Sequence, residues 1–180
     1  LDKRLRENGG RVFQLAQIAA GAKDYDAAIA AYEYIVEEKG RSSTFYLEAK
    51  REALRCRRNK LTDGFAYTRE ELLILQQQYE SFLSEFGRSR VTAGIISEQA
   101  ELEALYINDL NKAITLLTEV IEFPNADPIL VANAKLNLGD YYLMQSEVWE
   151  ATLLYSQVDK AYKEDALGNE ARYRNARLSY

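Results

Sequence analysis

The sequence predicts an all-α protein built from repeated antiparallel helix pairs, and three observations carry this prediction. The 180 residues include only 2 prolines and 9 glycines, the two residues that most destabilise a helix interior, so long helices are allowed. One spacing of apolar residues recurs four times along the chain. A residue able to cap a helix precedes each recurrence. With 47% hydrophobic residues, the chain is also long enough to bury a substantial core.

The recurring pattern is a small or aliphatic residue followed by large residues four and seven positions later. This spacing places all three side chains on one face of a helix. The pattern starts at Ala28, Leu75, Ala113 and Ala151, at intervals of 47, 38 and 38 residues. Its later members are Tyr32, Ile35, Tyr79, Phe82, Leu117, Val120, Tyr155 and Val158. Each occurrence predicts the second helix of a pair.

Short side chains that carry oxygen stand just before each of these helices. Such a side chain accepts hydrogen bonds from the free amides of the first helical turn. Thr68 and Glu71 have the spacing of a capping box. The other candidate caps lie at Asp24 to Asp26, at Asn108 and Asp109, and at Ser146 and Glu147. These residues predict where the second helices begin.

A first helix is expected upstream of each second helix, at 11–22, 43–58, 91–107 and 128–145. Asp127 followed by Pro128 predicts the start of the last of these, because proline is favoured at the first helical position. Glycines at 9, 10, 40 and 87 are expected at helix ends. The repeats are therefore placed at 11–40, 43–87, 91–124 and 128–162, with a half repeat at 165–180. This gives about nine helices in one solenoid over 1–180.

The segment 137–151 resembles the tetratricopeptide repeat (TPR) signature. In the resemblance, Leu138 and Gly139 lie where two helices touch, and Ala151 and Tyr155 face them from the second helix. A small residue is needed where helix axes come closest. The resemblance implies a right-handed superhelical solenoid. It is nearest to long bacterial TPR proteins of uncharacterised role.

Other repeats depart from the signature. The first has Ala16 at the glycine position, the second Lys50 and the third Glu101. A fifth repeat is placed at an interval of 38 residues by Ala171, Tyr173, Ala176 and Tyr180.

Both ends of the chain are expected to be cut from a longer protein, because the first residue is Leu1 and the last lies within a helical pattern. An interrupted terminal repeat leaves apolar surface uncovered. We therefore expect that the last helix either mediates self-association or is frayed. Compartment stays open between a bacterial cell envelope and the cytoplasm.

Composition argues against several functions. The net charge is −5, which disfavours nucleic-acid binding because phosphates need a basic surface. No apolar run is long enough to cross a bilayer. The chain has no histidine and one cysteine, so the commonest general base and a thiolate zinc cluster are missing. No phosphate-binding or nucleophile motif is present. The sequence predicts neither an enzyme nor a cofactor or metal site.

The 47-residue interval predicts an insertion of about 13 residues relative to a TPR hairpin, between Arg57 and Tyr67. This segment contains Phe65 and Tyr67. It is either a binding loop on a rigid scaffold or a continuation of the preceding helix, with its aromatic residues packed back.

A basic stripe precedes this segment, formed by Arg51, Arg55 and Arg58 at i, i+4 and i+7. TPR register points Arg51 and Arg55 toward the concave groove. The stripe is either a site for a carboxylate or phosphate or a solvated face paired with Glu48 and Glu52.

The TPR resemblance also implies one polar residue per first helix that faces the groove and hydrogen-bonds a peptide backbone. These residues are Gln14, Glu48, Gln99, Asn137 and Asn175. The carboxylate clamp for chaperone tails is not expected, because Phe13 and Gln17 replace its lysine and asparagine.

The function that the resemblance implies is a protein-interaction scaffold that binds a polypeptide segment in its groove. One alternative is a module for an anionic small molecule or polysaccharide at the basic stripe. Another is a structural spacer within a longer protein.

Overall fold

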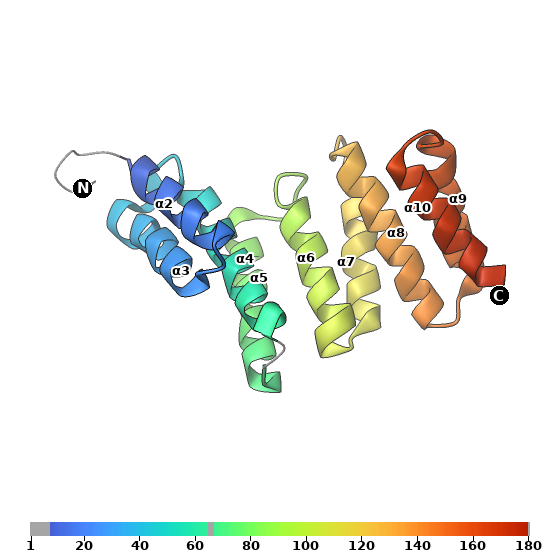
Figure 1. Cartoon of the computed structure of the whole chain (residues 1–180), viewed down its shortest axis with the longest axis horizontal. Coiled ribbons are helices and arrows are strands. Elements are labelled where there is room, and N and C mark those ends of the chain that lie inside the picture. Colours follow the sequence, from blue (N-terminus) through green and yellow to red (C-terminus); the bar gives the residue numbers. More distant parts are fainter. Residues whose placement is uncertain (1–7, 65–66, 180) are drawn as a thin grey trace. The chain divides into compact units, whose positions relative to one another are not determined.

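The computed structural model describes residues 8–64 and 67–179. These residues form nine α-helices and contain no β-strand, which confirms the all-α prediction and the expected number of helices. Figure 1 shows the helices in chain order. They are α2 (Gly10–Gly21), α3 (Tyr25–Tyr34), α4 (Tyr46–Gly64), α5 (Arg69–Phe86), α6 (Ala93–Leu102), α7 (Leu110–Glu122), α8 (Pro128–Met144), α9 (Val148–Ala161) and α10 (Ala166–Ala176).

The chain divides into two compact units, Leu1–Phe86 and Gly87–Tyr180. Unit 1 contains α2 to α5 and unit 2 contains α6 to α10. Within each unit every helix packs against the next one along the chain. The single solenoid over 1–180 stays a prediction, and each unit is described by itself. None of the described helices has the length and apolarity needed to cross a bilayer.

The core of unit 1 is built from the residues that the repeat pattern selects. Ala28, Tyr32 and Ile35 are buried together with Phe13 and Ala16. The Phe13 ring contacts the Tyr32 ring edge-on, with centroids 5.3 Å apart. Small residues of α4 complete the core, and they include Ala49, Ala53 and Cys56.

The core of unit 2 explains the glycine of the TPR-like signature. A Cβ atom at Gly139 would lie 2.5 Å from the Tyr155 ring, closer than carbon atoms approach. Tyr155 itself is fully buried beside Ala151 and Val158. Glycine at 139 therefore lets α8 approach α9 closely enough to bury this ring.

Most of the predicted helix caps are present. Asp24, Asp109 and Asp127 each accept a hydrogen bond from the amide three residues later, at 3.2, 3.0 and 2.9 Å. Thr68 and Glu71 form the complete capping box: Glu71 accepts from the Thr68 amide at 2.7 Å and Thr68 accepts from the Glu71 amide at 3.2 Å.

The cap expected at Ser146 is wrong. Ser146 has a φ of 67° and belongs to the turn after α8. No side chain caps α9, which follows Glu147. Ser146 adopts the left-handed backbone conformation that is common just after a helix ends, so it terminates α8 and does not cap α9.

The insertion is helix rather than loop over most of its length, because α4 continues to Gly64. Asp63 holds this extension against the start of α3: it accepts hydrogen bonds from the Tyr25 hydroxyl at 2.7 Å and the Lys23 ammonium at 3.0 Å. Phe65 lies outside the described residues. Tyr67 lies in the short connection before α5 and is exposed. Of the two alternatives for this insertion, a continued helix is confirmed over residues 59–64 and a loop is wrong there.

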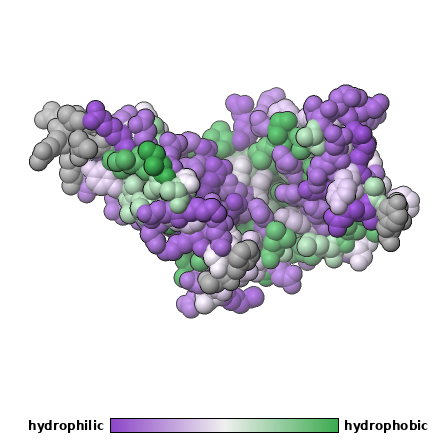
Figure 2. Space-filling model, in the orientation of Figure 1, coloured by the Kyte–Doolittle hydropathy of each residue, from purple (hydrophilic) through white to green (hydrophobic). Residues whose placement is uncertain are grey.

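Each unit exposes some large apolar side chains. Figure 2 shows a hydrophobic area over α2, where Leu15 and Ile18 are exposed. In unit 2, Trp149 and Leu153 of α9 and Tyr173 of α10 are exposed. Self-association through the last helix stays a prediction.

Candidate functional site

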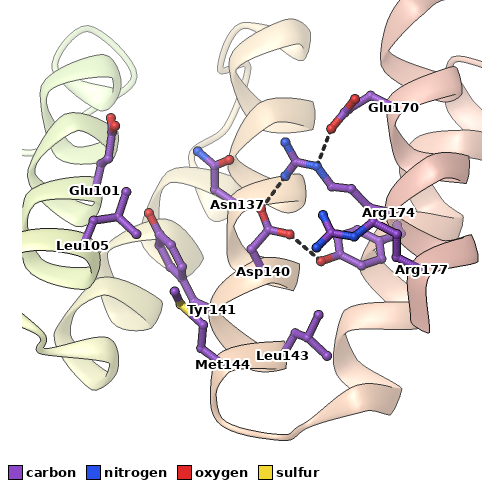
Figure 3. A pocket seen from close by; sticks show the side chains of 11 residues that line it. Glu101, Leu105, Asn137, Asp140, Tyr141, Leu143, Met144, Glu170, Arg174 and Arg177 are labelled. Carbon is purple, nitrogen blue, oxygen red and sulfur yellow. Dashed lines mark hydrogen bonds and ion pairs between the residues drawn. The ribbon is translucent and has the colours of Figure 1, made fainter. Parts of the chain in front are cut away.

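Unit 2 contains a cavity of about 630 Å³. Most of its lining comes from α6, α8 and α10 and from the π-helical turn η3 (Glu103–Ile107) that follows α6. Tyr155 of α9 and Arg177 of the 3-10 turn η4 (Arg177–Ser179) complete it. Figure 3 shows how the lining side chains converge. They are Glu101, Leu105, Asn137, Asp140, Tyr141, Leu143, Met144, Tyr155, Glu170, Arg174 and Arg177.

A chain of hydrogen bonds centred on Asp140 fixes one wall of the cavity. The Asp140 carboxylate accepts from the Tyr155 hydroxyl and from the Arg174 guanidinium, both at 2.6 Å. Arg174 also donates from its Nε to Glu170 at 2.7 Å. These bonds connect α8 to both α9 and α10. Burial, followed by the hydrogen bond to Asp140, raises the pKa of Tyr155 above its usual range, so its hydroxyl stays a donor.

Tyr141 presents a polar atom to the cavity from an otherwise buried side chain. The residue is only 4% exposed, and it lines the cavity. Its hydroxyl makes no hydrogen bond to another described residue. Burial, with the negative charges of Glu101 and Asp140, raises the pKa of Tyr141 above its usual range. The hydroxyl therefore stays protonated, able to donate or accept a hydrogen bond but unsuited to act as a base.

Two more polar groups face the cavity without an internal partner. The Asn137 amide is half-buried and makes no hydrogen bond within the described part of the chain. The Arg177 guanidinium is exposed, and no carboxylate among the described residues pairs with it. Its guanidinium carbon lies 5.8 Å from the ring centroid of Tyr173, and its charge also acts on Tyr155. A ligand in the cavity could thus meet an amide, a hydroxyl and a cation.

Apolar side chains complete the cavity. Leu105 is 51% exposed and Met144 is 57% exposed, and Leu143 lies beside them on the lining. Exposed apolar surface next to unpartnered polar groups is the usual composition of a binding site.

The predicted basic stripe of unit 1 is engaged with its own helix. Arg51 forms ion pairs with Glu48 and with Glu52, and Arg55 pairs with Glu52 at 2.8 Å. Arg58 lies within 3.4 Å of the Asn59 side-chain oxygen. These contacts agree with the interpretation of a solvated, internally paired face. Binding of an external anion at this stripe stays a prediction.

One cavity of unit 1 involves two other basic residues of α4, Lys50 and Arg57. It measures about 310 Å³, and Lys50 and Arg57 line it together with residues of α3 and α5. Lys50 is paired with Glu85 and Arg57 with Glu33. Desolvation works against the charge of Lys50, but the Glu85 hydrogen bond leaves its pKa raised overall. The cations at this cavity are thus already neutralised.

Among the five residues predicted to face the groove, Asn137 lines the unit 2 cavity. Gln14 is exposed on α2, and its role stays a prediction. Glu48 is paired with Arg51. The structure places the remaining two, Gln99 and Asn175, elsewhere.

The prediction that Gln99 faces the groove is wrong, because Gln99 is 0% exposed and cannot touch a ligand. The prediction carried an interval of 38 residues back from α8 to α6. The turn η3 is π-helical, and such a turn holds one residue more than an α-helical turn. For residues that precede η3, the equivalent position in α8 is therefore 39 residues later. Gln99 then corresponds to the buried Leu138, and Glu101 corresponds to Asp140.

The prediction that Asn175 faces the same groove as Asn137 is also wrong. Asn175 borders a different hollow, beside Trp149 and Arg172. The fifth repeat follows the fourth at 37 residues rather than 38: the buried Ala171 then matches the buried Ala134. In this register Arg174 takes the place of Asn137. The sequence contained this signal, but the predicted interval of 38 obscured it.

The sequence analysis also missed Asp140, Tyr141 and Arg177. Their side chains acquire significance only through helix packing, and no local motif marks them. No group of three or more acidic or cysteine side chains within residues 8–64 and 67–179 is arranged to hold a metal ion. Comparison with protein-family models and with curated proteins finds no match to the sequence.

Proposed function

We propose that the chain is part of a right-handed, TPR-like solenoid that binds a polypeptide segment of a partner protein, with the unit 2 cavity as the contact site. The observation that carries the proposal is the set of groups at this cavity that lack an internal partner. The Tyr141 hydroxyl, the Asn137 amide and the Arg177 guanidinium all face it. These groups border an open cavity, so a ligand that enters can replace the water around them with direct hydrogen bonds.

The arrangement of the cavity supports a polypeptide as the ligand. Its walls come from α6, α8 and α10, the first helices of successive predicted pairs. A segment lying across them would meet each helix in turn. Asn137 can both donate to and accept from a main-chain amide, since a carboxamide has both groups. Leu105 and Met144 would receive an apolar side chain.

The same features support binding rather than catalysis. The raised pKa of Tyr141 keeps its hydroxyl protonated, and Asp140 is held by Tyr155 and Arg174. Neither group is therefore poised to take a proton from a ligand.

The two alternative functions receive less support. An anion at the basic stripe would compete with the ion pairs that Arg51 and Arg55 form with Glu52. A pure spacer has no need for an unpartnered hydroxyl in a buried tyrosine.

Selection from a library of random peptides tests this proposal. The chain is immobilised, enriched peptides are sequenced, and their affinities are measured by calorimetry. Asn137→Ala should weaken binding by about 2- to 12-fold, the equivalent of one neutral hydrogen bond.

The matched control is Asn133→Ala on the same helix. Asn133 is exposed, does not line the cavity, and donates to the Ile129 carbonyl at 3.0 Å. This variant should bind peptides as the unchanged chain does. The proposal fails if no peptide is enriched, or if Asn133→Ala weakens binding as much as Asn137→Ala.

A further inference from the structure

The charges that line the unit 2 cavity are distributed unevenly. Figure 3 shows Glu101 on the α6 side and Arg174 and Arg177 on the α10 side. Arg174 is engaged by Asp140 and Glu170. Arg177 has no carboxylate partner among the described residues. The α10 side thus offers one cation to a ligand, while the α6 side carries a carboxylate.

We propose that this cavity selects a segment in which an apolar side chain lies between an acidic and a basic residue. The acidic residue lies against Arg177, the apolar residue against Leu105 and Met144, and the basic residue on the Glu101 side. This inference rests on the proposed function, because it assigns a ligand chemistry to the same site.

The charge balance favours a carboxylate over a phosphate at Arg177. Three carboxylates and two guanidinium groups line the cavity, so its formal charge is −1. A phosphate group carries close to two negative charges at neutral pH. Placing it here would add repulsion from Asp140 and Glu170, whereas a carboxylate brings a single charge to the single cation without a partner.

The apolar part of the ligand is expected at the exposed side chains between the charged walls. Leu105 comes from η3 and Met144 from the end of α8, and both are more than half exposed. Covering them removes apolar surface from water, which favours binding. The Tyr141 hydroxyl is then available to the ligand main chain, because no described residue uses it.

Peptide selection also provides the first test of this inference. Enriched peptides should share an apolar residue with an acidic residue on one side and a basic residue on the other. Enrichment of apolar residues without flanking charges, or with acidic residues on both sides, would overturn the inference and leave the proposed function standing. Absence of any enriched peptide would overturn both.

Charge reversal provides the second test. Arg177→Glu should weaken the best selected peptide about tenfold or more, as expected from losing a charge-assisted hydrogen bond. The same variant should prefer a peptide in which lysine replaces the acidic residue, an exchange that a merely structural role of Arg177 would not produce. Glu101→Lys should give the converse preference at the basic residue.

Arg90→Glu is the matched control, because it changes the net charge equally in the same unit. Arg90 is exposed and does not line the cavity. It should leave both affinity and preference unchanged. Circular dichroism verifies that each variant is folded. A variant of the best selected peptide with phosphoserine in place of its acidic residue should bind more weakly than that peptide does. Tighter binding would contradict the assignment of a carboxylate to Arg177.

Discussion

Polar residues in the two units have different relations to their neighbours. On α4 of unit 1, Arg51 and Arg55 pair with Glu48 and Glu52 of the same helix, and each cation at the nearby cavity also has its carboxylate. In unit 2, Asn137 on α8 and Arg177 in the turn after α10 face a larger cavity without such partners. If the proposed function holds, a few groups left unpaired beside apolar surface indicate the binding site better than a high density of charge does.

The largest expected effect concerns the close contact of α8 with α9. Gly139→Ala would force a Cβ atom into the Tyr155 ring, and overpacking of this kind costs about 1–3 kcal/mol of stability. Ala16 stands at the same repeat position in unit 1, where a methyl group is accommodated. Ala16→Gly weakens the helix and removes a fully buried methyl group, so it should cost about 1–2 kcal/mol.

Hydrogen exchange followed by mass spectrometry measures both changes, because it reports on each unit separately. Gly139→Ala should raise exchange in unit 2 more than Ala16→Gly raises it in unit 1. Equal effects would show that the Tyr155 ring can move aside.

A smaller effect is expected from the carboxylates that hold other side chains. Asp140→Asn removes the charge that Tyr155 and Arg174 donate to but keeps one accepting oxygen, so it should cost about 1–2 kcal/mol. Glu52→Gln in unit 1 affects Arg51 and Arg55 at a more accessible surface and should cost at most about 1 kcal/mol. Denaturant unfolding gives both values, and the reverse order would contradict the distinction between the units.

Alkaline pH should weaken the fold through its buried tyrosines. Burial raises the pKa of Tyr32 to about 12, whereas an unfolded tyrosine ionises near pH 10. Between these values the unfolded state binds fewer protons, so stability is complete below about pH 10 and falls by up to about 1.4 kcal/mol per pH unit until about pH 12.

Tyr32→Phe should reduce this dependence for unit 1, where Cys56 and Tyr25 also have raised pKa values. It should leave the dependence of unit 2 in place, since Tyr141 and Tyr155 also have raised pKa values. Hydrogen exchange at pH 9 and pH 11 separates the two. An unchanged slope in unit 1 would show that Tyr32 ionises without unfolding.

The smallest effect is expected at the basic stripe. Arg51→Gln with Arg55→Gln removes surface ion pairs, each worth about 0–1 kcal/mol. Affinity for a selected peptide should stay within about twofold of that of the unchanged chain, which is less than the loss of one hydrogen bond. A tenfold loss would move the binding site to unit 1.

The fold was predictable from sequence because local chemistry decides most of it. Asp109 and Asp127 cap helices through their own side chains, and Ala28 and Tyr32 are buried at the spacing that selected them. These features depend on neighbours only a few residues away, so the sequence displays them directly.

The site was only partly predictable, because single-residue shifts in register decide which side chain reaches it. Asn137 was found through the TPR-like signature. Gln99 was misplaced by the extra residue in η3, and Asn175 was chosen in place of Arg174 by an interval one residue too long. An insertion of one residue rotates the side chains that follow it by about 100° around the helix axis. An error of one residue in the repeat interval therefore leaves the predicted helix boundaries nearly unchanged, but it selects a buried residue in place of one that faces the cavity.

The central claim is that the unit 2 cavity is where a polypeptide binds. Backbone amide NMR spectra of the chain titrated with a selected peptide test it most directly. The account predicts that saturable shifts concentrate at Leu105, Asn137, Tyr141, Arg174 and Arg177, and that they vanish for the peptide without its charged residues. Shifts confined to α3, α4 and α5, or to the basic stripe of Arg51, Arg55 and Arg58, would contradict it.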